Sequence, residues 1–180
     1  MTTSMQEAWR APGSEWLKDH PRFLEIAYDS SRRLFVRVYP VMKHISPALT
    51  ERFMRWSEDL VKGWIFNCRM CGQCILHSTG MTCPMTCPKA LRNGPCGGVR
   101  PDGNCEVIPE IRCVWVQAWE RSQRMRAYAH DLHLVQPPLN HALQNTSAWI
   151  NLVEGREVET PSGWGLARPH GAAGNAGRVE

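Results

Sequence analysis

Eight cysteines are the residues of this chain best suited to chemistry, and all of them lie between Cys68 and Cys113. Thiols in such a cluster bind metals in a reducing compartment and form disulfides in an oxidising one. The first residues of the chain do not have the pattern of a secretory signal, which favours metal binding. We therefore predict that all eight are metal ligands: Cys68, Cys71, Cys74, Cys83, Cys87, Cys96, Cys105 and Cys113.

The first three cysteines are separated from one another by only two residues. At this spacing each thiolate can reach a separate iron of a [4Fe–4S] cluster, while a remote cysteine binds the fourth iron. A structural zinc usually takes two cysteines from each of two knuckles, so the triplet favours iron–sulfur. Four cysteines then remain for a second site, which the spacing leaves open to a second [4Fe–4S] cluster or to zinc. The spacing does not decide which cysteines share a site.

Other residues near the cysteines are candidates for supporting roles. We predict that Gly72, Gly97 and Gly98 bind the cofactor, because glycines allow backbone N–H groups to approach cluster sulfurs. Three basic side chains could offset the negative charge of a thiolate-ligated cluster or could simply be solvated: Lys89, Arg92 and Arg100. His77 lies among the cysteines, but we expect it to be a supporting or surface residue since eight thiols suffice.

Helices are expected before and after the cysteines. Apolar spacing predicts an amphipathic helix over residues 21–45, which Pro40 should bend or end. Ser46 and Pro47 signal the start of a second helix. Its apolar stripe is more typical of a core face than of a docking face, although both remain open: Leu49, Phe53, Trp56, Leu60 and Trp64. A third helix is expected from Pro109, with Cys113 in its first turn.

Residues 67–107 have almost no periodicity and too little apolar surface to fold without metal. Within them, residues 98–107 resemble a small hairpin that turns at Pro101-Asp102-Gly103. The predicted fold is mainly α, with an irregular, metal-stapled cysteine-rich core and a small β-hairpin. We divide the chain into an N-terminal arm (1–21), a helical hairpin (22–66), an iron–sulfur module with its following helix (67–133) and an irregular C-terminal extension with a flexible tail (134–180).

Composition excludes several classes of protein. The chain has 180 residues, of which 43% are hydrophobic and 21% charged, as in ordinary globular proteins. A net charge of +4 is too mild to indicate nucleic-acid binding. There is no run of 18 apolar residues, so no membrane span is expected. The predicted location is the cytoplasm.

The cysteine region resembles a known family, the MetV-type iron–sulfur subunit of methylenetetrahydrofolate reductase, which also occurs as a C-terminal extension of the reductase. The resemblance covers roughly residues 64–152. It rests on these segments: Cys68–Cys74, Thr79–Lys89, Arg92–Gly98, Cys105–Val107, Cys113–Trp115 and Ser147–Asn151.

The resemblance implies an accessory subunit that carries [4Fe–4S] clusters, and the count of eight cysteines predicts two of them. It implies a separate catalytic subunit with FMN or FAD and the folate site, because that barrel needs about 250 residues. The expected function is electron transfer in one-carbon metabolism, with no active site on this chain. The alternative is a structural metal-stapled module that stabilises the flavoprotein without carrying electrons. We expect docking through the arm with Trp9 and Trp16 and through the segment around Trp149.

Overall fold

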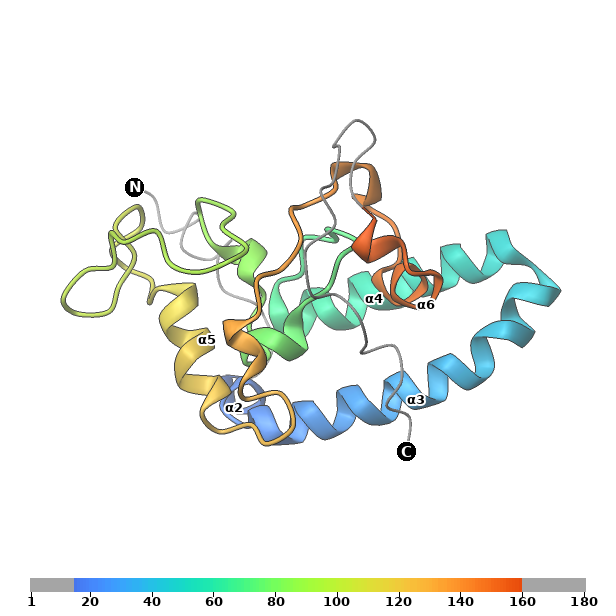
Figure 1. Ribbon diagram of the computed structural model, residues 1–180, viewed down its shortest axis with the longest axis horizontal. Coiled ribbons are helices and arrows are strands. Elements are labelled where there is room, and N and C mark those ends of the chain that lie inside the picture. The colour runs from blue at the N-terminus through green and yellow to red at the C-terminus, as the bar shows by residue number, and fades with distance from the viewer. Residues whose placement is uncertain (1–14, 160–180) are drawn as a thin grey trace, which may run out of the picture.

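A long antiparallel pair of helices dominates the protein (Figure 1), in a computed structural model that describes residues 15–159. A short helix α2 (Glu15–Lys18) precedes α3 (Pro21–Ile45) and α4 (Pro47–Phe66). Ser46 caps α4 by accepting a hydrogen bond from the Leu49 N–H, and Pro47 occupies its first turn, as predicted. Pro40 does not end α3, which continues to Ile45.

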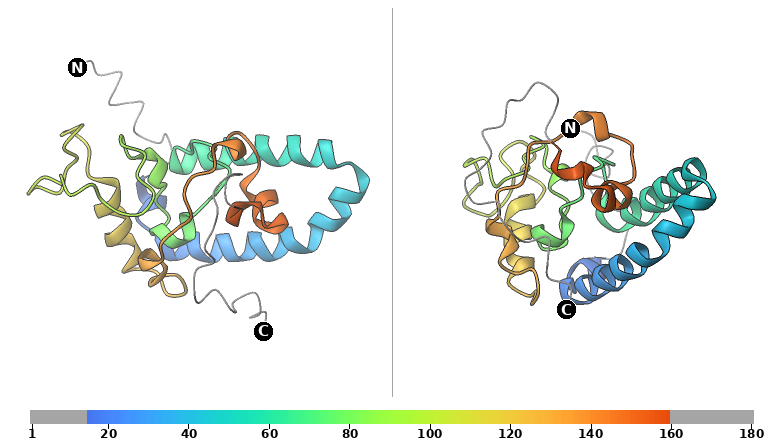
Figure 2. Two further views of the ribbon diagram at one scale, coloured as in Figure 1. Left: turned by 45° about the horizontal axis from the view of Figure 1, so that its top comes forward. Right: turned by 45° about the vertical axis from the view of Figure 1, so that its right-hand side comes forward.

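Part of the remaining described chain lies against the inner side of this pair, whereas the loops of residues 88–112 extend away from it. Two further helices, α5 (Val114–Ser122) and α6 (Ala148–Glu154), are joined by loops with short 3-10 turns. These turns are η1 (Leu76–Thr79), η2 (Pro84–Thr86), η3 (Asp131–His133), η4 (His141–Leu143) and η5 (Arg156–Val158). Figure 2 shows α6 and the cysteine-rich loops beside the helix pair from two further directions. The fold is mainly helical, as predicted.

Three small apolar clusters hold these parts together. Phe35 and Tyr39 of α3 pack on Ile150 of α6. In the second cluster, Leu24 of α3 packs on residues from the loops: Leu76, Met81 and Met125. This cluster also contains Cys83. The third consists of Cys113, Trp115 and Ala118. Two of the three clusters therefore include a cysteine, so the packing of the core and the placing of the thiols are linked.

The apolar stripe of α4 does not face the core. Its five side chains are each between 51% and 66% exposed: Leu49, Phe53, Trp56, Leu60 and Trp64. The core interpretation of this stripe is therefore wrong. The inner side of α4 instead buries Thr50 and Glu58, which make hydrogen bonds there.

The predicted hairpin is also not found, and the described residues contain no β-strand beyond a single bridge. A turn does form at the predicted place, because the Gly103 N–H donates to the Arg100 carbonyl (2.8 Å). After this turn, Asn104 pairs with a later residue, Arg112, in a single antiparallel bridge. This pairing keeps residues before Cys113 out of a helix, so α5 begins at Val114 rather than at Pro109.

Among residues 15–159, no helix is both long enough and apolar enough to cross a membrane.

Candidate metal centre

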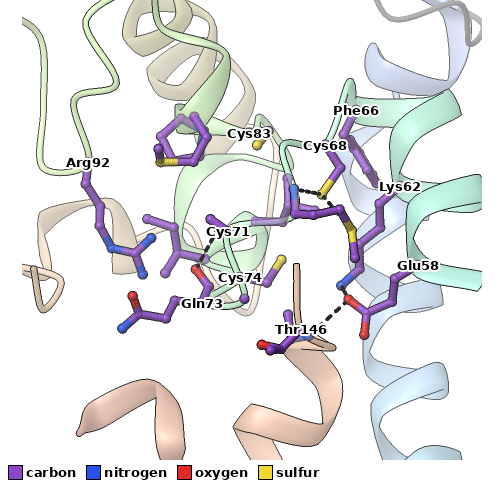
Figure 3. Close-up of a pocket in the computed structure, with 17 residues that line it drawn as sticks. Glu58, Lys62, Phe66, Cys68, Cys71, Gln73, Cys74, Cys83, Arg92 and Thr146 are labelled. Carbon is purple, nitrogen blue, oxygen red and sulfur yellow. Dashed lines mark hydrogen bonds and ion pairs between the residues drawn. The ribbon is translucent and has the colours of Figure 1, made fainter. Parts of the chain in front are cut away.

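The eight cysteines line two separate cavities, four in each. The first cavity is lined by Cys68, Cys71, Cys74 and Cys83 (Figure 3). The second is lined by Cys87, Cys96, Cys105 and Cys113. All eight are free thiols. The structure thus gathers the cysteines into two groups of four, a division that the spacing left open.

The first cavity begins where α4 ends. Asn67 adopts a left-handed conformation (φ 53°, ψ 50°) that stops the helix, and the triplet of cysteines follows at once. The loop is held from the C-terminal side, because the Asn151 side chain donates to the Gly72 carbonyl (2.8 Å). The Gln73 side chain accepts from the Asn140 N–H (2.7 Å). Residues 140–151 therefore fix the loop that carries the first three thiols.

Gly72 lines the first cavity, and packing explains why a glycine stands there. Its φ is +74°, and a Cβ on it would collide with the backbone of Leu143. Gly97 and Gly98 do not line the second cavity. A Cβ on Gly98 would collide with the Glu106 carboxylate, whereas one on Gly97 would meet nothing within 4 Å. The cofactor-binding role predicted for the three glycines stays a prediction.

Two buried cations flank the first cavity. The Lys62 amino group donates to Glu58 (2.6 Å), and both side chains are buried, at 13% and 4% exposed. The Arg92 Nε–H donates to the Pro137 carbonyl (3.1 Å), while its Nη1 is buried without a hydrogen-bond partner among the described residues. In the view of Figure 3, Lys62 and Arg92 lie on either side of the thiols.

Buried cations and an unpartnered guanidinium N–H fit an anionic occupant, since buried donors almost always have acceptors. Four thiolates around a metal cluster are such an occupant. Burial raises the pKa of Cys68 to about 12 and also raises the pKa of Cys74 and Cys83. These thiols would therefore stay protonated near neutral pH without a metal to bind the thiolate. The donor set and its charges thus fit a thiolate-ligated metal group.

Lys62 is charged in this setting. Burial opposes its charge, but the thiolate form of Cys74 and the Glu58 carboxylate outweigh burial and raise the pKa of Lys62 above the ordinary lysine value. Sequence reasoning singled out Arg92 but missed Lys62 and Glu58. The available signal was an acid–base pair four residues apart, one and a half turns before the first cysteine of the triplet.

The second cavity includes one exposed thiol and an exposed ion pair. Cys96 is exposed, and its thiol donates to the Glu106 carboxylate (3.1 Å). Glu106 also forms an ion pair with Lys89, and both side chains are more than a third exposed. Lys89, Glu106 and Trp115 line this cavity together with the four thiols. Lys89 is thus positioned to offset thiolate charge, although water screens it.

One short turn joins the two cavities. Cys83 lines the first and Cys87 lines the second, and the 3-10 turn η2 (Pro84–Thr86) is all that separates them. The Thr86 hydroxyl donates to the Cys83 carbonyl (2.6 Å), and the Cys87 N–H donates to the Pro84 carbonyl (3.0 Å). The turn is therefore closed by its own hydrogen bonds.

In the part of the chain that the structure describes, no three His, Cys, Asp or Glu side chains come close enough together to hold one metal ion. The four cysteines of each group line one cavity without converging on one point. His77 does not line either cavity; it stacks on Tyr28 at 5.3 Å between ring centroids. This agrees with the supporting role expected for it.

The fold and these two groups of thiols define a small helical protein with a cysteine-rich module. The family model described as the C terminal of methylene-tetrahydrofolate reductase matches residues 47–142, more than half of the chain, and the protein belongs to this family. No curated protein matches the chain, and neither does any solved structure.

Proposed function

We propose that the protein is an iron–sulfur accessory subunit of a flavin-dependent methylenetetrahydrofolate reductase. The observation that carries the proposal is the division of eight cysteines into two cavities of four. Family membership supports the association with the reductase. The resemblance to the MetV-type subunit supports iron–sulfur chemistry and a cytoplasmic location, where thiols stay reduced.

A [4Fe–4S] cluster is the group that best suits the first cavity. Its ligands would be Cys68, Cys71, Cys74 and Cys83. Four thiols around one zinc must all point to one centre at about 2.3 Å, whereas cubane ligands each bind a different iron. Thiols that line a cavity without converging on one point favour the second arrangement. A cluster bound here would supply one-electron transfer, and Lys62 and Arg92 would stabilise the charge of its thiolates.

The second cavity is proposed to hold a second [4Fe–4S] cluster on Cys87, Cys96, Cys105 and Cys113. Zinc at this site remains the alternative, because the four ligands come from a stretch of irregular chain that either metal can staple. In both cases metal binding would supply folding free energy to residues 67–113, which contain no long helix.

The proposed partner is the catalytic subunit, with FMN or FAD and the folate site. The exposed stripe of α4 is the surface that we propose docks on it, since runs of exposed apolar side chains along one helix face mark interaction sites. Trp149 is half-buried and stacks on Tyr28 (5.4 Å between ring centroids), and a contact through the segment around it stays a prediction. The expected contact through Trp9 lies outside the described residues, while Trp16 is 62% exposed.

Metal analysis of the anaerobically purified protein tests the proposal. We expect about eight irons and eight acid-labile sulfides for each chain, and an electron paramagnetic resonance signal on reduction. About four irons with one zinc would support zinc at the second site. Zinc without iron would refute the iron–sulfur proposal.

A second measurement separates electron transfer from a purely structural role. An electron-transfer subunit should have a reversible reduction potential and should exchange electrons with the flavin of the bound catalytic subunit. If the clusters stay oxidised with the reduced flavoprotein while the complex remains intact, the metal-stapled structural module is correct instead.

A further inference from the structure

Lys62 lies between a carboxylate and the first group of thiols. It belongs to α4 and lines the cavity together with Cys68 and Cys74. Its amino group donates to the Glu58 carboxylate (2.6 Å) and lies 5.5 Å from the centroid of the Trp149 ring. A lysine with a 13% exposed side chain cannot be fully hydrated, so its neighbours must stabilise the charge.

Glu58 neutralises this charge only in part, because other donors share its carboxylate. The Ser147 hydroxyl and the Trp149 N–H (3.1 Å) donate to Oε1. The Ala148 N–H (3.3 Å) donates to Oε2, which also accepts from Lys62. Donors at the start of α6 therefore stabilise part of the negative charge of the carboxylate, while the ammonium group of Lys62 adjoins the cavity.

The charges at the second cavity are different. Its lysine, Lys89, is 42% exposed and pairs with Glu106, which is 37% exposed. Water screens such a pair strongly, whereas a buried charge acts through a medium of low dielectric constant. The two cavities thus differ in the positive charges beside their thiols. The first is lined by Lys62 and Arg92, which water screens little, whereas the second is lined by Lys89, which is exposed and therefore screened.

We propose that Lys62 is a positioning residue that raises the reduction potential of the cluster in the first cavity. The inference rests on the proposed function, because it requires a [4Fe–4S] cluster on Cys68, Cys71, Cys74 and Cys83. Reduction adds one electron from a low-potential donor and transfers no proton, so the cluster becomes more negative by one charge. A fixed cation beside the thiolates stabilises that reduced form, since net charge and hydrogen bonding set cluster potentials.

Redox titration of three variants, followed by electron paramagnetic resonance, tests the inference. Dithionite is the reductant, and iron is counted first in each preparation. Lys62→Met should favour the oxidised form of the first cluster at least tenfold. This corresponds to a reduction potential lower by about 59 mV for one electron. Lys62→Arg, which keeps the charge, should stay within threefold of the wild type. Lys89→Met is the matched control at the second cavity and should leave the first potential unchanged.

Glu58→Gln provides an independent check with the opposite sign. It removes the partly neutralising carboxylate and should favour the reduced first cluster.

The outcomes are distinguishable. If the wild type holds no iron, the proposed function fails. If Lys62→Met holds wild-type iron at an unchanged potential, the inference is wrong and the proposed function stands. Loss of the first cluster from Lys62→Met but not from Lys62→Arg would mean that the charge is needed for assembly, which also overturns the tuning role.

Discussion

His77 lies between two tyrosine rings in the turn that follows the cysteine triplet. Tyr28 stacks on it, and Tyr128 meets it edge-on at 5.2 Å between ring centroids. Its Nδ1 is buried without a hydrogen-bond partner in the described part of the chain. Burial, with a smaller effect of Arg32, lowers the pKa of His77 to about 4. The imidazole is therefore neutral in the folded protein at neutral pH.

This neutral histidine should make stability depend on pH. Between its unfolded pKa of about 6.5 and its folded pKa of about 4, the unfolded chain binds a proton that the folded protein does not. Stability is therefore lost as the pH falls through this range. We expect His77 alone to cost about 2 kcal/mol between pH 7.5 and pH 5.

Urea unfolding under anaerobic conditions at both pH values measures this loss. His77→Phe keeps an aromatic ring against Tyr28 and should lose about 2 kcal/mol less than the wild type. Equal losses in the two proteins would show that His77 does not titrate as described.

At the residue scale, the sequence predicted the thiols better than the groups around them. Cysteine spacing and count led to eight ligands in two sites, and the structure gathers them in two fours. It did not lead to Lys62 or Glu58, because a Glu–Lys pair four residues apart is common on solvated helices. Only the packing of α6 against α4 buries this pair, and that contact joins residues about 90 positions apart.

The Glu58 carboxylate joins α4 to the start of α6. Ser147, Ala148 and Trp149, at the start of α6, all donate to it. Glu58→Ala should lower the free energy of unfolding by about 3–5 kcal/mol, because it leaves Lys62 as a buried charge without its partner. Chemical denaturation of the metal-loaded protein measures the change.

Asp59 gives the matched control, since it is the neighbouring acidic residue and is exposed. Asp59→Ala should change stability by no more than about 0.5 kcal/mol. A similar small effect for Glu58→Ala would mean that α6 is held by its apolar contacts instead.

At the element scale, periodicity predicted the two long helices and their boundary at Ser46-Pro47. It could not predict which side of each helix faces inward. The spacing of apolar residues on α4 is the same whether the stripe packs against the core of this domain or against another protein. The start of α5 was misplaced for a related reason: the bridge between Asn104 and Arg112 depends on the loop geometry rather than on local propensity.

Considered as a whole, the molecule exposes large apolar side chains on both of its long helices. On α3 the exposed apolar residues include Phe23, Leu34 and Ile45, and the stripe of α4 adds two tryptophans. Tryptophan is enriched where interfaces concentrate their binding energy. The catalytic subunit is the proposed occupant of the α4 stripe.

Replacing two residues of the stripe should weaken binding without unfolding the protein. The double variant Trp56→Gln, Leu60→Gln should change the free energy of unfolding by about 1 kcal/mol at most, because both side chains are exposed. Its dissociation constant for the catalytic subunit should rise about 30-fold or more. Calorimetry with the purified subunits measures this.

Arg55 is exposed on the same helix but outside the stripe, so Arg55→Gln is the control and should bind as the wild type does. If the double variant also binds normally, the stripe of α4 is not the docking surface.

The turn between Cys83 and Cys87 has a magnetic consequence. Four peptide units separate the two Cα atoms by at most about 14 Å, and the 3-10 turn between them shortens this span. Two reduced clusters on these ligands would place two unpaired spins in one molecule at short range. The spectrum of the fully reduced protein should then be broadened and split, with a splitting in field units that is the same at two microwave frequencies. A spectrum equal to the sum of two isolated clusters would mean that the spins are too far apart to interact.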